Sequence, residues 1–288
     1  MGSSHYQKLK EKWVEKHRDL QFQFFDKHAD IISDFINSTR QFAVGSVSAV
    51  MLLSTPIAGL LPTPTHAASA VENKIDTSVF LVSDLANVLP KEIRPLSQNE
   101  EKSVEEILTR DFNFPVKAEL EGKKLNRSYG YIGAEQHLMR YPGDNINTHF
   151  VTQEDRLKYE SSGLAPGLGG WGYWAANADK LTEKDILEEK YYIAAPIFLA
   201  PGFHDNVGDF IKFFKYRKML VVNPNNGKAI VVVVGDAGPA EFTGKHLGGS
   251  PEVMSYLERF DGAQKGPVLY FFIDDPEDKI PLGPINVK

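Results

Sequence analysis

The spacing of apolar residues changes along the chain and separates several kinds of segment. Residues 42–61 form an uncharged, largely apolar run of 20 residues, the length that a helix needs to cross the hydrocarbon core of a bilayer. Small residues in an Ala68-Ser69-Ala70 pattern follow, as is typical of a signal-peptidase cleavage site. We therefore expect residues 42–70 to be a signal peptide or a retained signal anchor, with residues 42–61 in contact with the membrane.

Residues 1–41 precede that run and carry charges of both signs together with one apolar stripe at helical spacing. The stripe consists of Trp13, Leu20, Phe24, Ile31, Ile32, Phe35 and Ile36. It predicts an amphipathic extension, and both a membrane-surface helix and a plain cytoplasmic helix agree with it. Because Arg40 flanks the apolar run and the next Lys or Arg is Lys74, we expect a cytoplasmic amino end and an exported carboxy-terminal part.

Residues 71–127 have a mixed composition and indicate a linker that contains one helix. Ser97 and Glu100 have the S-x-x-E spacing of a capping box. The apolar residues that follow fall on one helical face: Val104, Ile107, Leu108 and Phe112. This pattern predicts a helix over about residues 98–112.

From residue 128 to the end, short apolar runs are cut by Gly, Pro and Asn, which predicts a β-rich domain over residues 128–288. The candidate strands are Tyr129–Ile132, Tyr191–Phe198, Met219–Val222, Ala229–Val234 and Val268–Ile273. Asn226-Gly227 predicts a hairpin with a tight primed turn, because this pair accepts positive φ angles. Ser250 and Pro251 are typical of a helix start and predict a short helix over residues 250–257.

Composition narrows the classes of function. With 32 Lys and Arg against 38 Asp and Glu, the chain has a formal charge of −6 and no cationic surplus for phosphate contacts, so we expect no nucleic-acid partner. The chain has no cysteine, which excludes disulfides, thiolate metal sites and cysteine nucleophiles.

A hairpin, a loop with Asp236 and a capped helix follow one another over residues 219–257. This order resembles the double-psi β-barrel of the rare lipoprotein A family, the expansin-like domains and the lytic transglycosylase A group, over about residues 191–257. The matching residues are Val221, Asn223, Asn226, Gly227, Lys228, Val231, Val233, Asp236, Gly238, Pro239, Gly244 and Ser250. The resemblance implies a mainly β fold, a six-stranded double-psi-like β-barrel with short helices, in which Ala229–Val234 is a central strand buried on both faces.

The resemblance also implies a cell-wall glycan groove in which an aspartate acts on a glycosidic bond. A carboxyl in a partly apolar site can protonate a leaving oxygen, so Asp236 is the candidate catalytic acid, with Glu241 and His246 as assisting residues. The alternative is that Asp236 caps a loop by accepting backbone N–H groups. Relatives usually carry a second aspartate where this chain has Gly248, and this departure weakens a two-carboxylate mechanism.

A Gly-rich stretch, residues 163–174, contains three large aromatic residues. Trp171, Tyr173 and Trp174 are candidate sugar-binding residues, because flat aromatic faces stack on pyranose rings; an aromatic cluster that fills the domain is the alternative. His204 and Asp205 follow an apolar strand and are further candidates for the same groove, although such a pair is more often a solvated turn.

His137 and Asp144 have the spacing with which zinc D-Ala-D-Ala carboxypeptidases present a His and an Asp to one metal. The third ligand motif of that family is absent from the sequence, and His149 or His204 would replace it only through the fold. We therefore assign no metal ligand and no cofactor.

Together these patterns predict an exported protein of the cell envelope, released or membrane-anchored, whose partner is peptidoglycan or another wall glycan. The principal hypothesis is a lytic transglycosylase-like enzyme. A non-catalytic glycan-binding module is the first alternative and a zinc-dependent wall peptidase the second.

Overall fold

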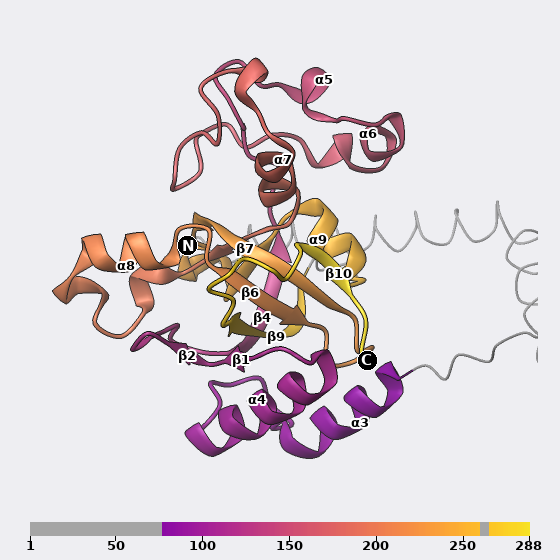
Figure 1. The fold of residues 1–288 in the computed structure, drawn as a ribbon, viewed down its shortest axis with the longest axis vertical. Coiled ribbons are helices and arrows are strands. Elements are labelled where there is room, and N and C mark those ends of the chain that lie inside the picture. The colour runs from indigo at the N-terminus through magenta and orange to yellow at the C-terminus, as the bar shows by residue number, and fades with distance from the viewer. Residues whose placement is uncertain (1–76, 260–264) are drawn as a thin grey trace, which may run out of the picture. The chain divides into compact units, whose positions relative to one another are not determined.

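The computed structural model describes residues 77–259 and 265–288, which belong to one compact unit, Glu72–Lys288 (Figure 1). The segments expected at residues 1–41 and 42–70 lie outside the described residues. None of the helices within 77–259 and 265–288 has both the length and the apolar character needed to span a membrane.

Six strands close into a mixed β-barrel. They follow one another around the barrel in the order β9, β4, β8, β5, β7 and β6, and β6 pairs again with β9. The β4–β8 and β5–β7 pairs are parallel, and the other four pairs are antiparallel. The strands are β4 (Tyr129–Ala134), β5 (Tyr192–Ala195), β6 (Lys218–Val222), β7 (Ala229–Ala237), β8 (Leu247–Gly249) and β9 (Lys265–Ile273). The closed, mainly β barrel expected from the sequence is confirmed.

Strand β7 is central to this barrel, as expected. It pairs with β6 along one edge and with β5 and β10 (Gly283–Ile285) along the other. Val232 and Val234 belong to the cluster inside the barrel, whereas Val231 belongs to a second cluster on the outer face. Both faces of the strand are therefore buried, which explains its continuous run of valines.

Two helices cover that outer face. Helix α3 (Ser78–Val88) and helix α4 (Gln98–Phe112) pack their apolar sides against β6, β7 and β9. The capping box predicted at the start of α4 forms, because Ser97 accepts the N–H of Glu100 and the Glu100 carboxylate accepts the N–H of Ser97. Asn113 ends α4 in the left-handed region at φ 59°. A short strand, β1 (Val116–Lys117), then pairs with β9.

The β6–β7 hairpin forms where Asn226-Gly227 predicted it, but its turn is longer than the two-residue primed turn expected. Asn223 donates its N–H to the carbonyl of Lys228 and accepts the N–H of Gly227. The Asn223 side chain also accepts the N–H of Asn225. Gly227 has a positive φ, 72°, whereas Asn226 does not. The Asn223 side chain thus stabilises a wider loop, in which only the glycine needs the left-handed conformation.

Two further helices lie beside the barrel. The expected helix after Ser250 is α9 (Pro251–Tyr256), with the Ser250 hydroxyl accepting the N–H of Val253. Helix α8 (Val207–Phe214) inserts Phe213 and Phe214 into the barrel cluster. A two-stranded hairpin, β2 (Glu119–Leu120) with β3 (Lys123–Lys124), completes the described strands.

Residues 135–191 form a long insertion between β4 and β5. It contains short helices joined by extended chain and lies at the opposite end of the view from α3 and α4 (Figure 1). Its α-helices are α5 (Ile146–His149), α6 (Gln153–Tyr159) and α7 (Glu183–Lys190), and its 3-10 helices are η2 (Glu160–Ser162) and η3 (Ala178–Lys180). The insertion carries most of the residues of the site described next.

Candidate functional site

His137 lies near the start of the insertion, and its backbone forms two hydrogen bonds. The His137 N–H donates to the carbonyl of Gly163 over 3.1 Å, and the His137 carbonyl accepts the N–H of Ala165 over 2.8 Å. These bonds fix the residue just after β4. Its side chain is fully buried at 0% exposure, and neither ring nitrogen has a hydrogen-bond partner. A buried polar ring without a hydrogen bond is costly, so this imidazole is a candidate to bind a ligand.

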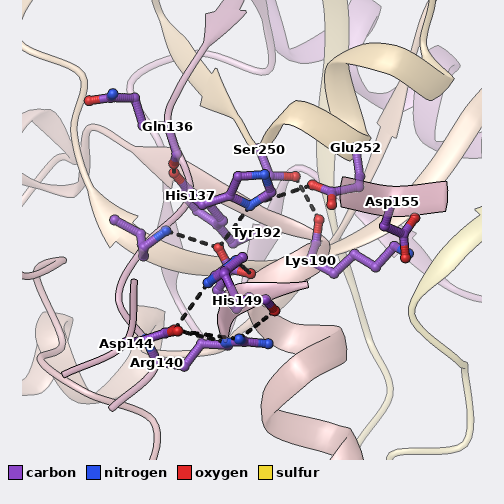
Figure 2. A network of polar contacts seen from close by, with 12 residues as sticks. Gln136, His137, Arg140, Asp144, His149, Asp155, Lys190, Tyr192, Ser250 and Glu252 are labelled. Atoms are coloured by element: carbon purple, nitrogen blue, oxygen red, sulfur yellow. Dashed lines mark hydrogen bonds and ion pairs between the residues drawn. The ribbon is translucent and has the colours of Figure 1, made fainter. Parts of the chain in front are cut away.

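His149 lies next to this ring, with the two ring centroids 4.7 Å apart. It ends the short helix α5, where Asn145 caps the amino end. His149 Nδ1 is 3.0 Å from Asp144 Oδ2, and His149 Nε2 is 3.1 Å from Glu189 Oε2. Figure 2 shows His137 and His149 facing one another, with Asp144 and Arg140 beyond His149.

Glu189 comes from the last turn of α7, immediately before the buried strand β5. Its Oε1 accepts the N–H of Leu138 over 2.9 Å and lies 3.4 Å from His137 Nδ1. Its Oε2 faces His149. The carboxylate therefore lies between the two imidazoles, and its orientation is fixed by the backbone.

Arg140 and Asp144 form the outer part of this cluster. The Arg140 Nε donates to Asp144 Oδ2 over 3.0 Å, and a second guanidinium nitrogen donates to the carbonyl of His149 over 2.5 Å. Burial alone would raise the pKa of Asp144, but hydrogen bonds from His149 and Arg140 outweigh it and hold that pKa well below its usual range. Asp144 is thus a fixed anion that accepts the Nδ1–H of His149.

The ring of His149 and the carboxylate of Glu189 are strongly coupled. Burial would lower the pKa of His149, but Asp144 and Glu189 raise it to about 9. Burial would raise the pKa of Glu189, but the two neighbouring imidazoles lower it to about 2. The raised pKa of His149 and the lowered pKa of Glu189 together favour an imidazolium–carboxylate pair across the 3.1 Å contact between His149 Nε2 and Glu189 Oε2.

One ligand atom from each of His137, His149 and Glu189 can be chosen so that all three lie within 4.8 Å of one another. Zinc bonds of about 2.0–2.2 Å at tetrahedral angles separate neighbouring ligand atoms by about 3.3–3.5 Å. Glu189 Oε1 lies 3.4 Å from His137 Nδ1, and the other carboxylate oxygen, Oε2, lies 3.1 Å from His149 Nε2. Two His and one Glu are also a ligand set of catalytic zinc sites. The Asp144 carboxylate contacts Nδ1 of His149 and so fixes the orientation of the ring, leaving Nε2 to face a ligand, as is usual for metal-binding histidines.

Glu252, on α9 of the barrel unit, approaches the cluster from another side. Its Oε2 is buried without a hydrogen-bond partner and lies 3.9 Å from His137 Nδ1 (Figure 2). Burial raises the pKa of Glu252 to about 7, and the nearby His137 opposes this only in part. A carboxyl in this state can exchange a proton near neutral pH.

A cavity of about 290 Å³ opens onto this cluster. Its polar wall includes His149, Glu189 and Glu252, and its apolar wall includes Phe150 and Ile186. The proposed ligand set is therefore buried from bulk solvent yet reachable from one side, as a catalytic metal site requires.

Asp236, the expected catalytic acid, lies near the end of β7. Its Oδ1 accepts the N–H of Gly170 over 2.5 Å and the N–H of Ala237 over 2.7 Å. Burial raises its pKa, and these two backbone N–H groups oppose the rise. Both features named for it from the sequence, a raised pKa and a loop-fixing role, are present together.

The aromatic candidates occupy different settings. The Trp171 indole N–H donates to the carbonyl of Val234 over 2.9 Å, which holds the Gly-rich loop on β7 next to Asp236. Trp174 packs on Tyr216 with ring centroids 5.9 Å apart. Tyr173 is exposed.

The remaining candidates lie apart from the histidine cluster. His204 and Asp205 are exposed on the 3-10 helix η5 (Phe203–Asp205). Glu241 and His246 line a separate cavity of about 180 Å³. Gly248 lies in β8, where an added Cβ would come within 2.4 Å of the Glu135 carboxylate, so that carboxylate occupies the space of a side chain at this position.

Sequence reasoning noted the spacing of His137 and Asp144 but assigned neither as a metal ligand. Asp144 contacts His149, and the third member of the candidate ligand set is Glu189. Sequence reasoning passed over Glu189 and Glu252. The signal for Glu189 was a pair of glutamates, Glu188 and Glu189, directly before an entirely buried strand, a place where a charge needs a specific partner.

Neither the models of known protein families nor the curated protein sequences contain a match to this chain. The closed barrel is compatible with the double-psi type, and the family relation itself remains a proposal.

Proposed function

We propose that this protein is a metal-dependent hydrolase of an amide or ester bond, with His137, His149 and Glu189 as metal ligands and Glu252 as the general base. The observation that carries the proposal is the buried His137 ring, which has no hydrogen-bond partner and lies beside a second His and a fixed carboxylate. Two His and one Glu are a ligand set of catalytic zinc sites, so zinc is the metal that we propose.

In this site a bound metal would polarise the substrate carbonyl and acidify a water molecule. Glu252 is placed to accept the proton as that water adds to the carbonyl carbon, and to pass it to the leaving nitrogen or oxygen as the scissile bond breaks. The apolar wall with Phe150 and Ile186 would hold the substrate and keep further water out.

The first substrates to assay are wall peptides, because the sequence predicts export to the envelope. The full-length chain, loaded with zinc, should release new amino groups from purified muropeptides, and a chelator should abolish this release. Glu252→Gln keeps the shape but removes the base, so the rate should fall by about 10²–10⁴-fold. Glu183→Gln is the matched control, because Glu183 lines the same cavity but is exposed. Equal rates for both variants would contradict the role of Glu252.

A second candidate function is glycan cleavage, which follows from the resemblance to rare lipoprotein A and the lytic transglycosylases. Its supporting observations are the raised pKa of Asp236 and the contact of the Gly-rich aromatic loop with that carboxylate. In this proposal Asp236 acts as an acid on a wall glycan. Its products would be shortened glycan strands, formed equally well with a chelator present and lost in Asp236→Asn. The two candidates therefore differ in product and in metal dependence.

A further inference from the structure

A second cavity lies on the barrel between the end of the β2–β3 segment and the loop after β7. It has a volume of about 180 Å³, and its charged and polar lining residues are Asn126, Arg127, Glu241, Lys245 and His246. None of these residues belongs to the candidate metal-binding group of His137, His149 and Glu189. The two sites are therefore formed by different residues.

Arg127 is the first unusual group in this cavity. Arg127 is half-buried, and its Nε is fully buried without a hydrogen-bond partner; within residues 77–259 and 265–288 the guanidinium forms no ion pair. Its stem packs over Gly130, where an added Cβ would come within 3.1 Å of Arg127 Cδ and 2.8 Å of His246 Cβ. A cation with a buried donor and no acceptor is expected where an anion binds.

His246 supplies a second donor. Its Nδ1 accepts the N–H of Tyr131 over 3.0 Å, and its ring stacks on Tyr131 with centroids 5.8 Å apart. Burial, Arg127 and Lys265 all lower the pKa of His246, which favours the neutral ring. Since Nδ1 is the acceptor, the proton of the neutral ring is on Nε2, where it can be donated to a ligand.

The charges around these donors favour an anion. Lys245 Nζ lies 2.6 Å from Glu135 Oε1 and also donates to the carbonyl of Ala134, so its charge is largely balanced. Lys265 Nζ donates to the carbonyl of Thr243. The opposing group among the lining residues is Glu241, which is exposed at the rim. The unbalanced charge inside the cavity is that of Arg127.

We propose that this cavity binds the carboxylate or phosphate group of a small ligand, with Arg127 and the Nε2–H of His246 as its donors. A planar guanidinium beside a single N–H matches the oxygens of either group. The site is separate from the hydrolytic centre and goes beyond the proposed function.

The test uses the full-length chain with inorganic phosphate and acetate as probes, measured by isothermal titration calorimetry at constant ionic strength. Because phosphate also binds metal centres, each titration is repeated after chelation and with Glu189→Gln. Saturable binding that survives both treatments is expected, and the stronger of the two probes identifies the ligand chemistry. Absence of saturable binding for both probes would overturn the proposal.

Variants then assign the donors. Arg127→Gln should weaken binding by about tenfold or more, Arg127→Lys should weaken it less, and Glu241→Gln should strengthen it. Arg94→Gln is the matched control, because Arg94 is an exposed arginine at the start of α4 that pairs with Glu100. If Arg127→Gln does not fold, the opposite effects expected for Arg127→Lys and Glu241→Gln still test the site. Equal affinities for wild type, Arg127→Lys and Glu241→Gln would contradict it.

Discussion

The barrel and the insertion between β4 and β5 bury different kinds of side chain. The barrel interior is filled with aliphatic and aromatic residues that alternate along its strands. The insertion contributes half of the buried polar or charged residues in the described part of the chain: His137, Arg140, Asp144, His149, Glu188 and Glu189. The barrel is stabilised by apolar burial, whereas the insertion is ordered around a charged cluster that needs partners. The barrel thus buries mostly apolar side chains, whereas the insertion buries a charged cluster.

The largest expected effect is on the free energy of unfolding, in the barrel. Phe272 is 1% exposed and packs against Phe213 and Phe214. Phe272→Ala should therefore cost about 3–5 kcal/mol, measured by urea denaturation. Leu187→Ala, at a position that is 41% exposed and lines the cavity beside His149 and Glu189, should cost less than about 1 kcal/mol. Similar losses for both variants would remove the contrast between the regions.

The next largest effect is expected in the insertion, where a substitution should lower the affinity for zinc. Asp144→Asn removes the anion that orients His149, so zinc affinity should fall by about 10–100-fold in competition with a chromophoric chelator. Asp155→Asn is the matched control, because Asp155 lines the same cavity but pairs with Lys190. If both variants bind zinc as wild type does, Asp144 does not orient His149 for metal binding.

A smaller effect is expected at the helix that covers the barrel. Ser97→Ala removes the acceptor for the Glu100 N–H at the start of α4, which should lower the free energy of unfolding by about 1 kcal/mol. Thermal and urea denaturation measure it. Because α4 packs on the barrel, this loss should accompany a single cooperative transition, and a separate early transition for α4 would contradict that coupling.

These cases show what the sequence could predict. The capping box, the valine-rich strand and the Ser250 helix start are local patterns, and each forms where the sequence indicated. Strand β8 was missed because Leu247-Gly248-Gly249 has one apolar residue and no alternation.

The candidate site was harder to predict because its members come from separate segments. His137, His149 and Glu189 meet only after the insertion folds back on itself, and polar clusters of this kind have no periodicity. The spacing of His137 and Asp144 drew attention to this segment, although no metal ligand was assigned from the sequence. In the structure Asp144 contacts His149, and Glu189 contacts both histidines.

The smallest effect on the free energy of unfolding is expected at Asp236. Its raised pKa means that the ionised form is disfavoured by folding, so its stabilising contribution is present below the unfolded pKa of about 3.9 and is lost as pH rises through the folded pKa. Asp236→Asn keeps the acceptor for Gly170 and Ala237, and should change the free energy of unfolding at pH 7 by less than about 1 kcal/mol. Wild type should lose stability relative to this variant as the pH rises from about 3.9. The opposite trend would show that Asp236 is needed as an anion.

The most direct test of the proposed metal site is the zinc content and zinc coordination of the full-length chain. After chelation, zinc addition and dialysis, elemental analysis should give one zinc per chain, and X-ray absorption should show two imidazole ligands with oxygen ligands completing the shell. His137→Gln and Glu189→Gln should lose the metal, whereas His204→Gln, at an exposed histidine, should retain it. A chain that retains no zinc, or that loses it equally in His137→Gln and His204→Gln, would contradict the account.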